Sequence, residues 1–149
     1  KWKQENLPLE TKSNGFKPAT FSGKINSDMI SGFEYIHNNL DHLKILDARS
    51  EEEFNGKIIR AANVGHVPNA INIDWNLNLN EDGTFKDDEE LSKLYDIPKN
   101  SEIVTYCQGA YRAANTFLVL KKLGFQNVRV YLGSWGEWGN RLDLPIEDN

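Results

Sequence analysis

The sequence has a single cysteine, Cys107, among 149 residues, so no disulfide can form within the chain. Its three histidines, His37, His42 and His66, are scattered and lack the spacing of a metal-binding motif. No apolar run approaches the roughly 18 residues that a transmembrane helix requires. The sequence therefore predicts a protein without a disulfide framework, without a metal ion and without a membrane partner.

Clusters of lysine and arginine are also lacking. The net charge is -5, and nucleic acids bind basic surfaces, so we expect no nucleic-acid partner. Acidic residues, in turn, are missing from residues 103–136, which contain Arg112, Lys121, Lys122 and Arg129. This segment suits an anionic ligand, although carboxylates are scarce in any run of core strand and helix.

The N-terminal residues lack the apolar core of a signal peptide. A single reduced thiol is compatible with the cytoplasm, which we favour as the compartment. The first residue is not Met, however, so we expect a processed or excised piece, and a targeting signal upstream stays open.

Length and periodicity indicate one α/β domain. Short apolar runs at 43–48, 102–106 and 127–132 alternate with helical patterns at 87–95 and 110–123. This order predicts a central, mostly parallel sheet of about five strands with helices on both faces.

The first 26 residues are polar and contain prolines and glycines, which predicts a linker or wrapping arm with a short strand at 19–21. Ser27 is predicted to cap a helix that extends to Leu40. Regular structure would thus begin shortly after the arm.

Cys107 stands where the apolar run 103–106 ends and a helical pattern follows. A thiol between a strand and a helix N-terminus meets loop amides and the positive end of the helix dipole, and both favour the thiolate. The alternative is a buried cysteine that acts as a small hydrophobe, because exposure decides reactivity. Asp47 also ends a strand, and ligands of parallel sheets bind beyond such ends.

Four residues separate Cys107 from Arg112. If the loop amides point inward, they form a nest that holds an anion, and the loop length sets the size of the nest. Cysteine-dependent phosphatases use a Cys-x5-Arg loop for a tetrahedral phosphate, so the shorter Cys-x4-Arg loop is better matched to a single sulfur atom.

Several motifs in this order resemble a rhodanese domain, and more narrowly the C-terminal, catalytic half of tandem-domain sulfurtransferases. The resemblance runs from about residue 21 to residue 146 and ends in a characteristic Gly-Ser-Trp-x-Glu-Trp. Its motifs are Leu46–Ser50, Glu53-Phe54-x-Gly56, Gly65–Ile73, Tyr106-Cys107 and Tyr131–Trp138.

The resemblance implies transfer of sulfane sulfur without a cofactor. Cys107 would take sulfur from thiosulfate or 3-mercaptopyruvate, hold it as a persulfide and pass it to cyanide or a thiol. Residues 21–149 would form the catalytic domain, and residues 1–20 a linker remnant or N-terminal arm beside a preceding rhodanese domain. The persulfide would be stabilised by the loop amides of Gln108, Gly109, Ala110, Tyr111 and Arg112.

The resemblance also gives roles to the surrounding residues. Arg112 would attract the donor and close the loop, and it would also pair with a carboxylate such as Asp47. Asp47 and Arg49 would support the loop, and His66 would be a structural hydrogen-bonding residue. Trp135 would pack the C-terminal turn or line the mouth of the pocket.

The loop departs from the family pattern in its glycines. Many rhodanese loops have glycine at the fourth position, where Ala110 stands here, so we expect the residue with positive φ to shift to Gly109. The loop also lacks the Gly-Ser-Gly-Val-Thr of mercaptopyruvate-specific members and the basic residue that follows the cysteine in thiosulfate enzymes. Thiosulfate is preferred because Arg112 supplies a fixed charge for a dianion.

Two other functions remain open at this point. The altered glycine pattern is compatible with a binding or regulatory module that keeps the fold without turnover. A cysteine-dependent phosphatase or arsenate reductase is the third candidate, which the loop length disfavours.

Overall fold

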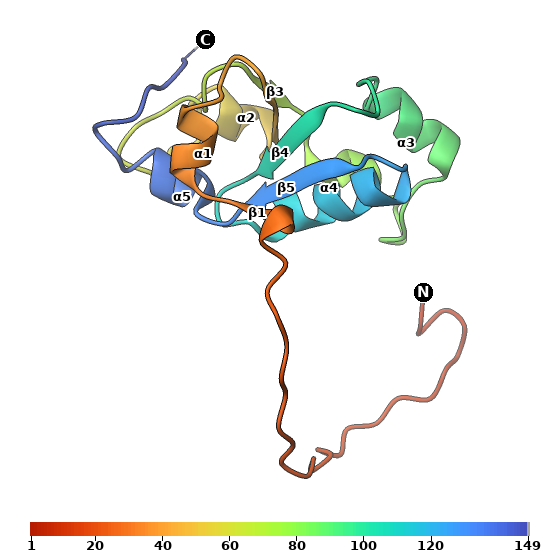
Figure 1. Ribbon diagram of the computed structural model, residues 1–149. Coiled ribbons are helices and arrows are strands. Elements are labelled where there is room, and N and C mark those ends of the chain that lie inside the picture. Colours follow the sequence, from red (N-terminus) through yellow and green to blue (C-terminus); the bar gives the residue numbers. More distant parts are fainter. Residues whose placement is uncertain (149) are drawn as a thin grey trace.

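The computed structural model describes residues 1–148 and contains one five-stranded sheet in the order β1-β5-β4-β2-β3 (Figure 1). All neighbouring strands pair in parallel, which confirms the predicted α/β sheet. The strands are β1 (Ile30–Ser31), β2 (Lys44–Asp47), β3 (Ala70–Asn72), β4 (Glu102–Tyr106) and β5 (Asn127–Tyr131).

Helices cover both faces of this sheet, as predicted. The α-helices are α1 (Phe33–His37), α2 (Glu51–Phe54), α3 (Asp88–Leu94), α4 (Tyr111–Lys122) and α5 (Ser134–Trp138). Two short 3-10 helices, η1 (Ser27–Met29) and η2 (Trp75–Asn78), precede β1 and follow β3. Residues of α3 and α4 share one core cluster, and residues of α1 and α5 share another.

The central strands β2 and β4 supply side chains to both core clusters. Ile45 and Val104 lie in the cluster with α1 and α5, whereas Leu46 and Ile103 lie in the cluster with α3 and α4. Alternate residues of a strand point to opposite faces, so a strand covered on both faces is apolar at every position. This is why β2 and β4 were recognisable as continuous apolar runs.

The helix predicted from Ser27 to Leu40 is wrong. Residues 27–29 form η1, capped by the side chain of Asn26, and the edge strand β1 follows. β1 pairs with β5, Ile30 opposite Val130, and this long-range pairing overrides the helical spacing of the apolar residues. Helix α1 starts only after the extended Gly32.

The N-terminal arm leaves the domain at η1 and extends away from it (Figure 1). Its residues are exposed, including Phe16 and Phe21, at 91% and 92% of their surface. The strand predicted at 19–21 is not formed, because these residues have no neighbouring strand to pair with among residues 1–148.

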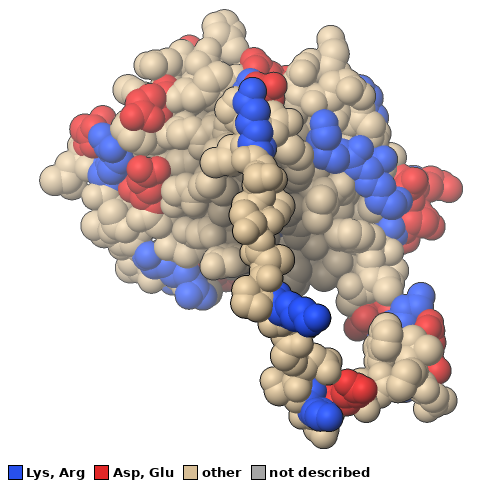
Figure 2. Space-filling view, turned by 60° about the horizontal axis from the view of Figure 1, so that its bottom comes forward, with Lys and Arg blue, Asp and Glu red and all other residues tan. Residues whose placement is uncertain are grey.

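No helix among residues 1–148 is long and apolar enough to cross a membrane. On the face shown in Figure 2, lysine and arginine side chains are interspersed with aspartate and glutamate. The sheet itself positions the site, since the carboxyl ends of β2 and β4 lie side by side, with Asp47 opposite Tyr106.

Candidate active site

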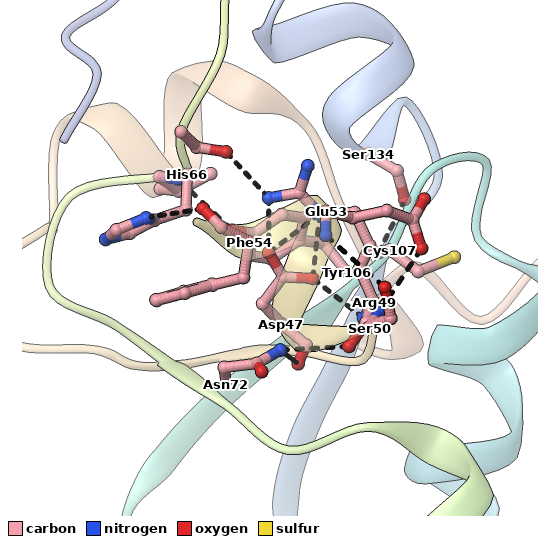
Figure 3. A network of polar contacts seen from close by, with 12 residues as sticks. Asp47, Arg49, Ser50, Glu53, Phe54, His66, Asn72, Tyr106, Cys107 and Ser134 are labelled. Atoms are coloured by element: carbon pink, nitrogen blue, oxygen red, sulfur yellow. Dashed lines mark hydrogen bonds and ion pairs between the residues drawn. The ribbon is translucent and has the colours of Figure 1, made fainter. Parts of the chain in front are cut away.

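The loop between β4 and α4 carries Cys107 at its base. Cys107 is 1% exposed and belongs to the core cluster of α3 and α4, whereas Tyr111, at the start of α4, is 91% exposed. In Figure 3 the Cys107 side chain points away from the Asp47–Arg49 pair. The thiol therefore lies at the floor of the loop, beyond the carboxyl end of β4.

Two of the five loop amides that were expected to hold a persulfide donate elsewhere. The Ala110 amide donates to Ser134 Oγ over 3.0 Å, and the Tyr111 amide donates to the carbonyl of Gly109 over 3.0 Å. Within residues 1–148, the amides of Gln108, Gly109 and Arg112 have no protein acceptor. These three are the ones available to an anion on Cys107.

The expected shift of the positive φ to Gly109 is wrong. Ala110 itself is in the left-handed region, with φ of 68°, and Gly109 is not. Ala110 is the residue directly before α4, where the chain turns from the loop into the helix. The turn stays at the fourth loop position although the glycine has moved, because the start of α4 fixes where the chain must reverse.

Arg112 pairs with Glu53, which corrects the expected pairing with Asp47. Arg112 Nη1 lies 2.5 Å from Glu53 Oε2, and its Nη2 lies 3.0 Å from Oε1. Arg60 Nε lies 2.8 Å from Oε1 of the same carboxylate and forms an ion pair with it. Two guanidinium groups thus share one carboxylate, whose side chain is only 3% exposed.

The short helix α2 directs Glu53 towards Arg112. Ser50 and Glu53 form a capping box, in which Ser50 Oγ accepts from the Glu53 amide and Glu53 Oε2 accepts from the Ser50 amide. Burial opposes ionisation of Glu53, but the hydrogen bond from Arg112, the Ser50 amide and the two nearby charges outweigh it and lower its pKa to about 2. The side chain is therefore fixed and ionised.

Arg112 stands at the far end of the loop that begins at Cys107. The hydrogen bond with Glu53 raises the pKa of Arg112 despite partial burial, and Cys107 raises it further. A cation at this end of the loop attracts anions to it.

Asp47 and Arg49 form a buried ion pair below the loop. Arg49 Nη2 lies 2.6 Å from Asp47 Oδ2 and also donates to the Gly65 carbonyl over 2.9 Å. The guanidinium stacks over Trp135 at 4.6 Å from the ring. Trp135 is 1% exposed, so it packs the core and does not line the mouth of the pocket.

His66 has structural contacts. Its Nδ1 lies 3.2 Å from the carbonyl of Phe54, and its ring stacks on the Phe54 ring at a centroid distance of 3.6 Å (Figure 3). His66 is 2% exposed and is linked to the C-terminal segment through Glu147. These contacts join the end of α2 to the rest of the domain.

Sequence reasoning missed the roles of Glu53, Arg60 and Ser134. Glu53 and Ser134 lie within motifs that the sequence displays, but their partners Arg112 and Cys107 are 59 and 27 residues away. The spacing of a motif predicts local structure and gives no such partners. Arg60 lies outside every helix and strand, and no local signal indicated it.

A cleft of about 480 Å³ opens beside α2, and Cys107 does not line it. The cleft is lined by Glu51, Glu52, Asn72, Asp74 and Leu77. This acidic lining would repel an anionic donor, so we do not assign the cleft to the reaction.

Within residues 1–148, no group of three or more His, Cys, Asp or Glu side chains is placed to hold a metal ion.

Known proteins have sequences similar to this one. The sulfur carrier protein TtuD of Thermus thermophilus is 36% identical over 98% of this chain and 58% of its own length. A thiosulfate sulfurtransferase of Azotobacter vinelandii is 32% identical over 98% of this chain and 56% of its own length. The chain thus spans little more than half the length of these relatives.

Solved structures agree with this result. SseA of Escherichia coli, a 3-mercaptopyruvate sulfurtransferase, superposes with a TM-score of 0.76 at 26% identity, covering 90% of this chain and 52% of that one. The model of the rhodanese-like domain matches residues 33–141. The match includes every residue of the Cys107 loop together with Glu53 and Ser134, and the chain belongs to the rhodanese family.

Proposed function

We propose that this domain is a sulfurtransferase that carries sulfane sulfur on Cys107. The observation that carries the proposal is the Cys107–Arg112 loop, which begins at the thiol and ends at a cation fixed by Glu53, while three of its amides have no protein acceptor within residues 1–148. Fixed donors around a developing negative charge stabilise it without reorganisation.

The reaction proceeds in two displacements. The Cys107 thiolate attacks the outer sulfur of thiosulfate, the sulfur–sulfur bond of the donor breaks, and sulfite leaves with the bonding electron pair. The acceptor, cyanide or a thiolate, then attacks the terminal sulfur of the persulfide. With cyanide a carbon–sulfur bond forms and gives thiocyanate, and with a thiolate a sulfur–sulfur bond forms and gives a persulfide of the acceptor. In both cases the bond between the two persulfide sulfurs breaks, and the Cys107 thiolate leaves with its electron pair.

Charge supports an anionic donor. Arg112 and Arg60 share the single carboxylate of Glu53, so the group keeps one net positive charge at the loop. Thiosulfate is the preferred donor because it carries two negative charges, and 3-mercaptopyruvate, with one carboxylate, is the alternative.

The test is turnover with thiosulfate and cyanide. The chain is expected to form thiocyanate, the Cys107→Ser variant none, and a variant in the arm, Lys17→Ala, as much as the unchanged chain. Turnover that survives in Cys107→Ser would contradict the proposal, as would no turnover with either donor.

A binding module without turnover is the second candidate. The observation that favours it is the burial of Cys107, whose residue surface is 1% exposed. In that case thiosulfate would bind, as seen by changes in the amide signals of Gln108 and Gly109, without any sulfur being transferred to Cys107.

We further infer that residues 1–20 are an arm that contacts a preceding rhodanese domain and that residues 21–149 are the catalytic domain. The support is the exposure of Trp2, Leu9 and Phe16 on a segment with no core of its own. Trypsin is expected to cut at Lys12, within the arm, and leave a resistant fragment; Lys17 precedes Pro18, a bond that trypsin does not cut. Equal cutting at Lys121 within α4 would contradict this division.

A further inference from the structure

We propose that Ser134 is a positioning residue that fixes the conformation of the Cys107 loop and thereby selects which loop amides face the ligand. The inference rests on the proposed function for its chemistry, but the contacts that carry it are independent of turnover. Ser134 is the first residue of α5, at the carboxyl end of β5, and lies beside Cys107 (Figure 3).

The hydroxyl of Ser134 is fully used by three backbone groups. Its Oγ accepts from the amides of Cys107, over 3.3 Å, and Ala110, over 3.0 Å. It donates to the carbonyl of Tyr131 over 2.8 Å. A hydroxyl has one donor and two acceptor positions, so this buried side chain has no capacity left for a substrate.

The next two residues of α5 hold the carbonyl groups of the same loop. The amide of Trp135 donates to the Cys107 carbonyl over 2.8 Å, and the amide of Gly136 donates to the Gln108 carbonyl over 2.9 Å. A Cβ on Gly136 would lie 2.9 Å from that carbonyl oxygen, so the approach admits only glycine. Residues 134–136 thus bind both the amides and the carbonyls of the loop.

The conformation of Ser134 indicates that its hydroxyl, and not its backbone, is what the position requires. Its φ of 52° is in the left-handed region, which glycine would adopt without strain. Serine is therefore the more strained choice for the backbone. The hydroxyl is the one feature that glycine could not supply.

The consequence is a defined set of amides for the ligand. Because Ser134 binds the amides of Cys107 and Ala110, these two cannot bind an anion on the sulfur. The bond to Ala110 also holds that residue in its left-handed conformation, which directs the chain into α4. The amides of Gln108, Gly109 and Arg112 remain, since neither Ser134 nor another described protein group accepts from them.

The experiment compares Ser134→Ala with Ser134→Gly. Both remove the hydroxyl, but only glycine relieves the backbone strain, so the two variants separate loop position from stability. We expect about tenfold faster hydrogen exchange at the amides of Cys107 and Ala110 in both variants, and unchanged exchange at Val104. We also expect the rate at which thiosulfate loads Cys107 to fall about tenfold in both, although Ser134→Gly unfolds at higher urea concentration than Ser134→Ala.

Each other outcome overturns the inference. Unchanged exchange at Cys107 and Ala110 would show that Ser134 does not hold them. If Ser134→Gly is more stable than Ser134→Ala and is also loaded as fast as the unchanged chain, the role of Ser134 is merely structural. If thiosulfate does not load Cys107 even in the unchanged chain, the proposed function fails. The inference is then tested by the affinity for thiosulfate, measured from the amide signals of Gln108 and Gly109. If this affinity is the same in Ser134→Ala as in the unchanged chain, or if no variant binds thiosulfate, the inference is overturned as well.

Discussion

At the scale of the residue, Ala110 carries a conformational cost within the loop. An alanine in the left-handed region is less stable by roughly 1–2 kcal/mol than in a right-handed conformation. The cost persists because the bond to Ser134 and the start of α4 determine this conformation. The loop glycine, Gly109, does not have a positive φ, so its conformation does not require glycine.

Replacing Ala110 with glycine is expected to stabilise the domain by about 1 kcal/mol, because glycine adopts a positive φ without strain. Urea unfolding measures the change. Gly109→Ala is the matched control, since a Cβ there meets no atom within 4 Å, and it is expected to change stability by less than about 0.5 kcal/mol. A destabilised Ala110→Gly would contradict this reading of the loop.

At the scale of the element, the four-residue helix α2 is the support of the active-site cation. Its capping box fixes Glu53, and Glu53 fixes Arg112 at the start of α4. A helix this short is marginal by itself, so its value to the site depends on these side-chain contacts. The motif Glu53-Phe54-x-Gly56 marks this segment in the sequence, but the direction of Glu53 depends on α4, which is distant in sequence.

Glu53→Gln tests this support. The pKa of Glu53 is lowered from 4.5 to about 2, so its contribution to stability is full above about pH 4.5 and is lost as the pH falls towards 2. Unfolding at pH 7 is expected to require about 2–3 kcal/mol less free energy in Glu53→Gln, because Arg112 loses its partner. Between pH 5 and 3 the stability of the variant should fall less steeply.

Glu51→Gln is the control, an exposed carboxylate on the same helix, with an expected effect below about 0.5 kcal/mol. Sulfur loading of Cys107 should slow in Glu53→Gln, because Arg112 is no longer held at the end of the loop. Equal acid sensitivity of Glu53→Gln and the unchanged chain would show that Glu53 is not the group that titrates.

Elements with local signals were predictable from the sequence. Asp87 caps α3, and Gly124 with φ of 87° follows α4, so both helices were recognised near their observed bounds. β1 was missed because nothing within Ile30–Ser31 indicates a strand, and only its pairing with β5 makes it one. The site follows the same rule. The loop of Cys107 has a local sequence signal and was predicted, whereas its partners Glu53 and Ser134 contact it over a long sequence separation and were not.

At the scale of the whole molecule, the C-terminal segment closes the domain next to the site. The backbone of Glu147 pairs with His66, and Gly65 has φ of 97° at the point of contact. A Cβ on Gly65 would clash with the backbone carbonyl of Glu147. The carbonyl of Gly65 also accepts from Arg49, so the closure is connected to the ion pair below the loop.

Gly65→Ala is therefore expected to destabilise the domain by about 2–3 kcal/mol, through both the clash and the positive φ. Thermal or urea unfolding measures it. Gly15→Ala, in the exposed arm with open space around the Cβ, should have almost no effect. Similar stabilities of the two variants would mean that Ile146 and Glu147 do not pack against Gly65.

The account as a whole depends on Cys107 as the carrier of sulfur. The most direct measurement is the mass of the peptide containing Cys107 after the chain meets thiosulfate, and again after cyanide is added. The account predicts a gain of one sulfur atom on Cys107, lost on addition of cyanide, with thiocyanate formed in equal amount. An unchanged mass with both thiosulfate and 3-mercaptopyruvate would contradict it.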